Sequence, residues 1–308
     1  MFTLLMVYIS LLTCSPGKDL YAAYGHTAIR VVDEERQTDL CYNYGTFSFD
    51  TEHFYWKFVR GETYYSLTVQ PTPYFFYNYI EEHRQVYEQR LNLSQAQAMA
   101  VRDALEVNCL PENSDYLYNF VFDNCATRPY HLLKEVLQDS VSSTYRGWEG
   151  RTYRDFIRHY TRPHTVQDAL INMVFGSKAD QPMHGEERLF LPEELMYFVE
   201  QTTLSNGSRL VQQSHIGRFR IRRVAWWENI YFYLALFAVV MTVLSYYDRR
   251  RGHLSYGVDI ALCVLYVSVL AIVVFLIYFS IHPLVGWNWR LAVVPTLHLC
   301  ARMVYIIR

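Results

Sequence analysis

The sequence lacks the features that mark several common classes of protein. Its 28 Lys and Arg residues are balanced by 30 Asp and Glu residues, and a net charge of −2 gives no cationic excess for nucleic acid. No two of the six cysteines have the C-x₂₋₄-C spacing of a structural zinc site, and the chain has no H-E-x-x-H motif or P-loop. We therefore expect no nucleic-acid partner, no metal and no cofactor.

The first thirteen residues are apolar, but they lack the basic n-region and the small-residue cleavage site of a secretory signal peptide. They are rich in β-branched and aromatic residues and end at Cys14-Ser15-Pro16-Gly17. This pattern predicts a buried first strand followed by a turn, and not a signal peptide.

Charged residues are scarce in the last part of the chain. Two uncharged runs, 229–247 and 260–289, are long enough for a helix to cross a bilayer, which needs about 20 apolar residues. A third apolar run, 291–307, contains only Arg302. We predict a transmembrane domain at 225–308, with spans at about 229–247, 258–281 and 291–307. Basic residues flank the first span on both sides, so charge alone does not orient it.

The preceding part of the chain is too apolar and too aromatic, at 51% and 17% for the whole sequence, to be a disordered tail. Its patterns predict an α+β fold with a catalytic core at 1–140 and a helical extension at 141–224. Predicted strands are residues 3–13, 26–33, 40–47, 64–70, 85–91 and 116–122, and predicted helices are residues 94–109, 124–137, 153–160, 165–175 and 192–201.

Cys125 is the candidate nucleophile. It follows Asp123-Asn124, both good N-cap types, so we expect it in the first turn of a helix. The helix N-terminus and Arg128, one turn further on, would each lower the pKa of its thiol. The alternative is a buried structural thiol, which is common.

A thiol nucleophile needs a base, and His26 is the candidate because it follows Gly25 at the start of a predicted strand. Asn43, in the neighbouring predicted strand, could fix the imidazole tautomer as the third member of the site. The alternatives are a structural histidine and an ordinary strand-end amide before Gly45. A disulfide among Cys14, Cys41 and Cys109 also stays open, because sequence does not decide pairing.

Four segments occur together in this chain: LLTCSPG at 11–17, YGHTAIRV at 24–31, YNYGTF at 42–47 and YNFVFDNCATRP at 118–129. With His282-Pro283 and Asn288-Trp289 in the apolar region, they make the chain resemble the Lnb-type lipoprotein N-acyltransferases of Bacteroidota. Two departures are that the expected leader is missing and that the membrane region ends early, and either could make this chain incomplete as an enzyme.

The resemblance implies a papain-like thiol-enzyme domain in circularly permuted order, as in NlpC/P60 and lecithin:retinol acyltransferase-like proteins, with appended helices and an α-helical transmembrane domain. It implies a multi-pass protein of the bacterial inner membrane whose catalytic domain faces the periplasm. The expected reaction takes an acyl chain from a phospholipid through a Cys125 thioester to the α-amine of a diacylglyceryl-cysteine lipoprotein or lipopeptide.

Supporting roles follow from the same resemblance. Asn124, Arg128 and Tyr44 are the expected oxyanion or substrate supports, and His282 and Asn288 are expected to contact lipid or acceptor. Helix-end anchoring at the membrane interface is the alternative for the last two. Two rival functions also stay open: a membrane-tethered cysteine peptidase or amidase of cell-wall peptides, and a non-catalytic periplasmic binding domain.

Overall fold

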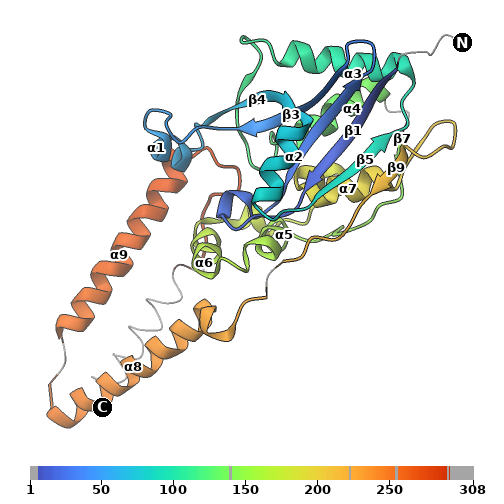
Figure 1. Cartoon of the computed structure of the whole chain (residues 1–308). Coiled ribbons are helices and arrows are strands. Elements are labelled where there is room, and N and C mark those ends of the chain that lie inside the picture. Colours follow the sequence, from blue (N-terminus) through green and yellow to red (C-terminus); the bar gives the residue numbers. More distant parts are fainter. Residues whose placement is uncertain (1–5, 139–140, 222, 254–255, 290, 292–308) are drawn as a thin grey trace, which may run out of the picture. The chain divides into compact units, whose positions relative to one another are not determined.

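The computed structural model describes residues 6–138, 141–221, 223–253, 256–289 and 291. The chain divides into two compact units (Figure 1). The first comprises residues 1–151 and 182–221, and the second comprises 152–181 and 222–308. The sequence-based boundaries at 140 and 224 differ from this division, because residues 182–221 return to the first unit and supply its last strand and a helix.

In the described part of the chain, seven antiparallel strands form the sheet of the first unit, in the order β6-β4-β3-β2-β1-β5-β9. A two-stranded sheet pairs β7 with β8. The strands are β1 (Val7–Cys14), β2 (His26–Asp33), β3 (Thr38–Thr46), β4 (Tyr64–Pro71), β5 (Val86–Leu91), β6 (Asp115–Leu117), β7 (Val141–Ser143), β8 (Thr202–Leu204) and β9 (Val211–His215).

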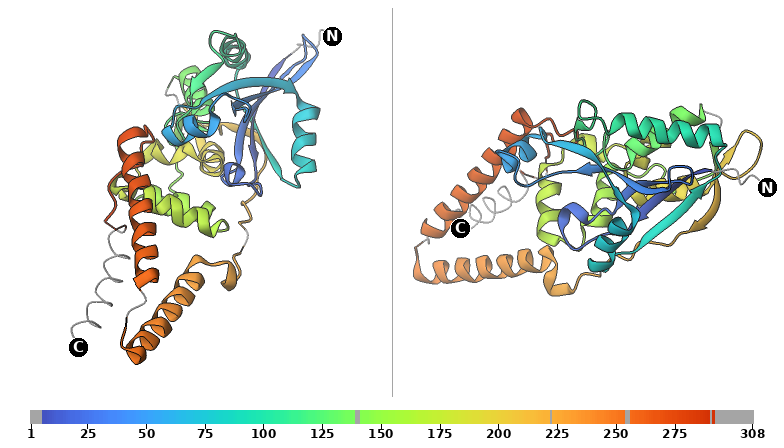
Figure 2. Two further views of the ribbon diagram at one scale, coloured as in Figure 1. Left: turned by 90° about the vertical axis from the view of Figure 1, so that its left-hand side faces the viewer. Right: turned by 45° about the horizontal axis from the view of Figure 1, so that its top comes forward.

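Helices cover both faces of the seven-stranded sheet. Figure 2 shows α2 on one face and α3 and α4 on the other. The mixed fold confirms the predicted α+β class. The helices of this unit are α1 (Phe54–Arg60), α2 (Thr72–Glu81), α3 (Gln95–Asn108), α4 (Thr127–Leu137) and α7 (Pro192–Glu200), with short 3-10 helices at Leu20–Ala22 and Gly185–Phe190.

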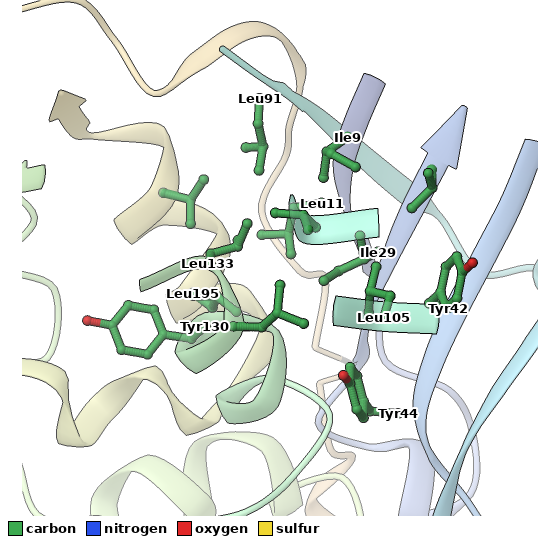
Figure 3. Close-up of a cluster of buried hydrophobic side chains, with 14 of the residues drawn as sticks. Ile9, Leu11, Ile29, Tyr42, Tyr44, Leu91, Leu105, Tyr130, Leu133 and Leu195 are labelled. Carbon is green, nitrogen blue, oxygen red and sulfur yellow. The ribbon is translucent and has the colours of Figure 1, made fainter. Parts of the chain in front are cut away.

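The alternation of side chains along each strand places a core on each face. The larger core packs strand residues against α3, α4 and α7 (Figure 3); the smaller one packs against Phe75 of α2. The larger core includes Ile9, Leu11, Ile29, Tyr42, Tyr44, Leu105, Leu133 and Leu195; the smaller includes Leu12, Cys14, Ala28 and Cys41.

The prediction of a strand at 116–122 is wrong beyond Leu117, because β6 ends there. The Asn119 side chain accepts hydrogen bonds from the N–H groups of Val121 and Phe122, and Asn119 forms a bridge with Asp123. An asparagine whose side chain accepts hydrogen bonds from the next backbone N–H groups favours a turn over strand pairing. This turn connects β6 to the segment that carries Cys125.

The second unit contains α5 (Tyr153–Thr161), α6 (Thr165–Val174), α8 (Ile230–Arg251) and α9 (Tyr256–Phe279), with short 3-10 helices at Ser177–Asp180 and Trp226–Glu228. Among the described residues, α8 and α9 are long and apolar enough to cross a membrane, as the first two predicted spans require. The third predicted span, 291–307, lies outside the described residues apart from Leu291.

Candidate active site

Cys125 lies just before helix α4, and Asn124 holds it there. The Asn124 carbonyl oxygen already accepts the N–H of Arg128 in helical fashion, and its side-chain Oδ1 accepts the N–H groups of Ala126 and Thr127. Both donors of the Asn124 amide are taken by the carbonyl oxygens of Phe120 and Phe190. Asn124 therefore holds the turn that leads into α4 and fixes the position of the cysteine.

Cys125 is a half-buried residue whose thiol is buried and lies close to the start of β2. Burial raises its pKa to about 11, although the backbone N–H groups of Thr27 and of Cys125 itself lower the pKa in part by hydrogen bonding to sulfur. The expectation of a lowered pKa is therefore wrong. The thiol is protonated at neutral pH and needs a base.

Arg128 does not supply the positive charge expected at the thiol. Its guanidinium forms a two-pronged ion pair with Asp123, with distances of 2.6 and 2.9 Å. The same guanidinium lies 3.5 Å from the ring centroid of Tyr116. The neighbouring carboxylate offsets its charge, so Arg128 acts on the ring and not on the sulfur.

His26 begins β2, and its Nε2 is hydrogen-bonded to Oδ1 of Asn43 in β3. Burial lowers the pKa of His26 to about 4, the Asn43 bond opposes this shift, and the charge of Arg84 adds to it. The imidazole is therefore neutral at pH 7. A neutral imidazole beside a protonated thiol is the resting state of a general-base pair and not of a preformed ion pair.

Gly45 is where these residues converge. A Cβ placed on Gly45 would lie 3.4 Å from Cβ of Cys125, 3.9 Å from Cε1 of His26 and 3.9 Å from Oη of Tyr116. Gly45 has φ of +89°, a conformation that glycine adopts without strain, and it lies where the β3–β4 pairing shifts register. The missing side chain leaves a space bordered by the thiol residue, the imidazole and a phenol.

The remaining predicted support in this unit, Tyr44, is a core residue. It is 1% exposed, and its hydroxyl accepts a hydrogen bond from the Asn108 amide. Sequence reasoning missed Thr27, Gly45 and Tyr116 as members of the site. The glycine could have been suspected from its position directly after Asn43-Tyr44, but nothing in the sequence pointed to the other two.

Cys14 and Arg84 are further neighbours of His26 that the sequence did not reveal. Cys14 pairs with His26 across β1 and β2, is fully buried, and has a pKa raised by burial. Nε of Arg84 donates to the Ser15 carbonyl oxygen at 2.7 Å, and its guanidinium lies 4.6 Å from the Tyr79 ring centroid. Cys14, Cys41 and Cys109, which all lie within the described residues, are free thiols, so no disulfide forms among them.

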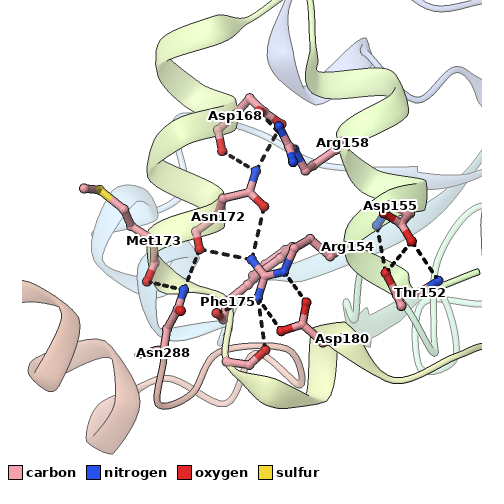
Figure 4. Close-up of polar contacts among 11 residues, drawn as sticks. Thr152, Arg154, Asp155, Arg158, Asp168, Asn172, Met173, Phe175, Asp180 and Asn288 are labelled. Atoms are coloured by element: carbon pink, nitrogen blue, oxygen red, sulfur yellow. Dashed lines mark hydrogen bonds and ion pairs between the residues drawn. The ribbon is translucent and has the colours of Figure 1, made fainter. Parts of the chain in front are cut away.

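His282 and Asn288 belong to the second unit. Asn288 is 8% exposed, and its amide donates to the carbonyl oxygens of Asn172 at 2.7 Å and Met173 at 3.4 Å (Figure 4). His282 lies in the turn before it, where its carbonyl oxygen accepts the N–H of Val285. Asn288 thus ties the segment after α9 to helix α6.

Arg154 organises the same part of the second unit. Its guanidinium donates to the Asp180 carboxylate, to Asn172 and to the carbonyl oxygens of Phe175 and Gly176 (Figure 4). A buried arginine with this many partners fixes the loop that follows α6. Across the described part of both units, no group of three or more His, Cys, Asp or Glu side chains is placed to hold a metal ion.

Comparison with known proteins identifies both parts of the chain. No curated protein and no solved structure matches it. A family model described as the Lnb N-terminal periplasmic domain matches residues 2–159, and one described as the Lnb transmembrane domain matches residues 228–308. The protein is therefore a membrane protein with a periplasmic domain, and the chain belongs to the Lnb family.

Proposed function

We propose that this protein is a lipoprotein N-acyltransferase of the bacterial inner membrane, with Cys125 as nucleophile, His26 as base and Asn43 as the residue that orients the base. The observation that carries the proposal is the convergence of the cysteine and the Asn43-bonded histidine on Gly45. Family membership supports a role in lipoprotein N-acylation. The membrane domain supports lipid substrates, because both acyl donor and acceptor keep their chains in the bilayer.

In the first half-reaction, Cys125 sulfur attacks the ester carbonyl carbon of a phospholipid while His26 takes the thiol proton. Because Asn43 Oδ1 can only accept, His26 Nε2 carries a proton and Nδ1 is the free base. The tetrahedral intermediate collapses, the glycerol oxygen takes the proton from the imidazolium, and a lysophospholipid leaves. An acyl thioester remains on Cys125.

In the second half-reaction, the free α-amine of a diacylglyceryl-cysteine lipoprotein or lipopeptide attacks the thioester. His26 accepts a proton from the attacking nitrogen and returns one to the leaving sulfur. The products are the triacylated acceptor and the free enzyme. The N–H of Cys125, which already points toward sulfur, is a backbone donor for the oxyanion in both steps.

Intact mass spectrometry of the full chain in phospholipid bilayers tests the proposal. We expect an acyl-sized mass gain that hydroxylamine removes, present in the wild type and absent in Cys125→Ala. Cys109→Ala is the matched control, because Cys109 is also a partly buried free thiol and should leave the adduct unchanged. Adding a diacylglyceryl lipopeptide should discharge the thioester and yield triacylated peptide.

Other outcomes of this experiment separate the rival functions. A wild type that forms no adduct with lipid but cleaves cell-wall peptides would be a cysteine peptidase or amidase. If the wild type reacts with neither lipid nor peptide, Cys125 is a structural thiol of a binding domain. Its raised pKa is compatible with that role as well.

A further inference from the structure

The hydroxyl of Tyr116 is buried and has no hydrogen-bond partner among the described residues. The residue is 5% exposed. Leaving a buried hydroxyl unbonded costs on the order of 1–3 kcal/mol. An unsatisfied buried polar group calls for an explanation, and a catalytic role is one.

The hydroxyl borders the space at Gly45. Tyr116 Oη, Cβ of Cys125 and Cε1 of His26 lie within 3.4 to 3.9 Å of the same point, the position that a Cβ of residue 45 would occupy. The oxyanion that forms when Cys125 attacks a carbonyl carbon is stabilised by donors placed near it, and a second donor would add to the N–H of Cys125. Tyr116, on β6, is such a donor.

The surroundings keep this phenol protonated and hold its ring in place. Burial and the nearby Cys125 raise the pKa of Tyr116 above its usual value, so the hydroxyl stays a donor. Arg128 lies over the ring at 3.5 Å and is itself fixed by Asp123. A cation over the ring draws electron density from the phenol and strengthens its O–H as a donor.

We propose that Tyr116 is a catalytic residue whose hydroxyl donates a hydrogen bond to the oxyanion formed when Cys125 attacks a carboxylic ester or thioester. Arg128 is then a positioning residue that acts through the Tyr116 ring. The phenol keeps its proton throughout, and no bond to it forms or breaks. The assignment of a lipid ester as the substrate rests on the proposed function, but the role of Tyr116 applies to any acyl donor.

Two reactions of Cys125 test the role of Tyr116, because only one of them forms an oxyanion. Acylation by a p-nitrophenyl ester passes through a tetrahedral oxyanion, whereas alkylation by iodoacetamide displaces iodide and does not. In the full-length Tyr116→Phe variant, we expect acylation to slow about 10²-fold or more, as for loss of an oxyanion donor. Alkylation should stay within about twofold of wild type, because neither the thiol nor the base is touched.

Tyr44→Phe is the matched control. It also removes one buried tyrosine hydroxyl from the same core, but that hydroxyl already accepts a hydrogen bond from Asn108. The ratio of acylation to alkylation should stay at the wild-type value. A Tyr116→Phe variant in which both rates fall together, or in which neither changes, would overturn the proposal.

Phospholipid as donor separates this inference from the proposed function. If the wild type is acylated by the p-nitrophenyl ester but never by phospholipid, and Tyr116→Phe loses only the acylation, the lipid function fails and the role of Tyr116 stands. If phospholipid acylates the wild type and Tyr116→Phe at equal rates, the function stands and the role of Tyr116 fails.

Discussion

The imidazole of His26 is bonded through Nε2 to the side-chain oxygen of Asn43 on the adjacent strand, which leaves Nδ1 as the nitrogen that can accept a proton. His26 is paired with Cys14 of β1 and Asn43 with Thr68 of β4, while β2 and β3 pair directly from Ile29–Tyr42 to Asp33–Thr38. The orientation of the base is therefore set by the rigid sheet, and a variant at Asn43 changes the imidazole without moving the cysteine.

Replacement of Asn43 by alanine should lower the rate of Cys125 acylation about 10²-fold, because an imidazole free to turn loses its alignment. Asn43→Asp keeps an acceptor but adds a negative charge, which raises the pKa of His26 from about 4. The acid limb of its rate profile should shift to higher pH. Acylation measured from pH 4 to 9 checks both variants, and an unshifted limb in Asn43→Asp would contradict this role.

The reactivity of the thiol should follow its raised pKa. Because the folded protein keeps Cys125 protonated up to about pH 11, we expect its alkylation by iodoacetamide to rise about tenfold per pH unit between 7 and 10. Cys125→Ser provides the background from the other thiols. A rate that levels off below pH 9 would indicate a preformed thiolate and contradict the neutral pair.

Gly45→Ala should impair the site beyond its cost to the fold. The positive φ makes alanine less stable there by about 1 kcal/mol, and the new Cβ lies 3.4 Å from Cβ of Cys125. Gly207→Ala is the matched control, since Gly207 has φ of +80° and no described heavy atom within 4 Å of its added Cβ. Unfolding midpoints should fall similarly in both, and acylation should fall only in Gly45→Ala.

Glu194 should make stability depend on pH. Burial raises its pKa from 4.5 to about 7, and the Tyr145 hydroxyl donates to it at 2.6 Å. The folded protein thus holds this proton to higher pH than the unfolded chain does, so its stabilising effect is complete below about pH 4.5 and is lost as pH rises toward 7.

Glu194→Gln removes that titration while leaving an oxygen to accept from Tyr145. Relative to wild type, the variant should gain up to about 3 kcal/mol in free energy of unfolding between pH 4.5 and 8. Denaturant unfolding at the two pH values measures the difference. The effect of His26 on the free energy of unfolding is the same in both proteins and cancels in the comparison. Equal pH dependence of that free energy in the two proteins would therefore refute the raised pKa of Glu194.

Local sequence patterns predicted much of the fold. Strand β2 was predicted with its observed bounds, and the Ser94–Gln97 capping box begins helix α3 as expected. Helices α1 and α2 were missed, because their many tyrosines and phenylalanines have modest helix propensity and resemble strand residues. Pro73, in the first turn of α2, was the available signal for a helix start.

The site itself was only partly accessible from sequence. Residue types and chain order indicated Cys125 and His26, but the pKa of the thiol depends on burial and on the partner of Arg128. Asp123, two residues before the cysteine, takes the guanidinium that was expected to stabilise a thiolate. The contribution of Tyr116 depends on pairing between β4 and β6, a long-range contact that no local pattern encodes.

The order in which the strands of the sheet are made has a consequence for biogenesis. Strands β1 to β4 pair with sequence neighbours, whereas β5 receives its outer partner only when Val211–His215 has been synthesised, shortly before the first membrane helix at Ile230. Until then, the outer edge of β5 is open to pairing with another chain. Translocation and membrane insertion therefore compete with aggregation at the outer edge of β5. Substitutions that disrupt β9 should lower the yield of folded protein more than the stability of the folded protein.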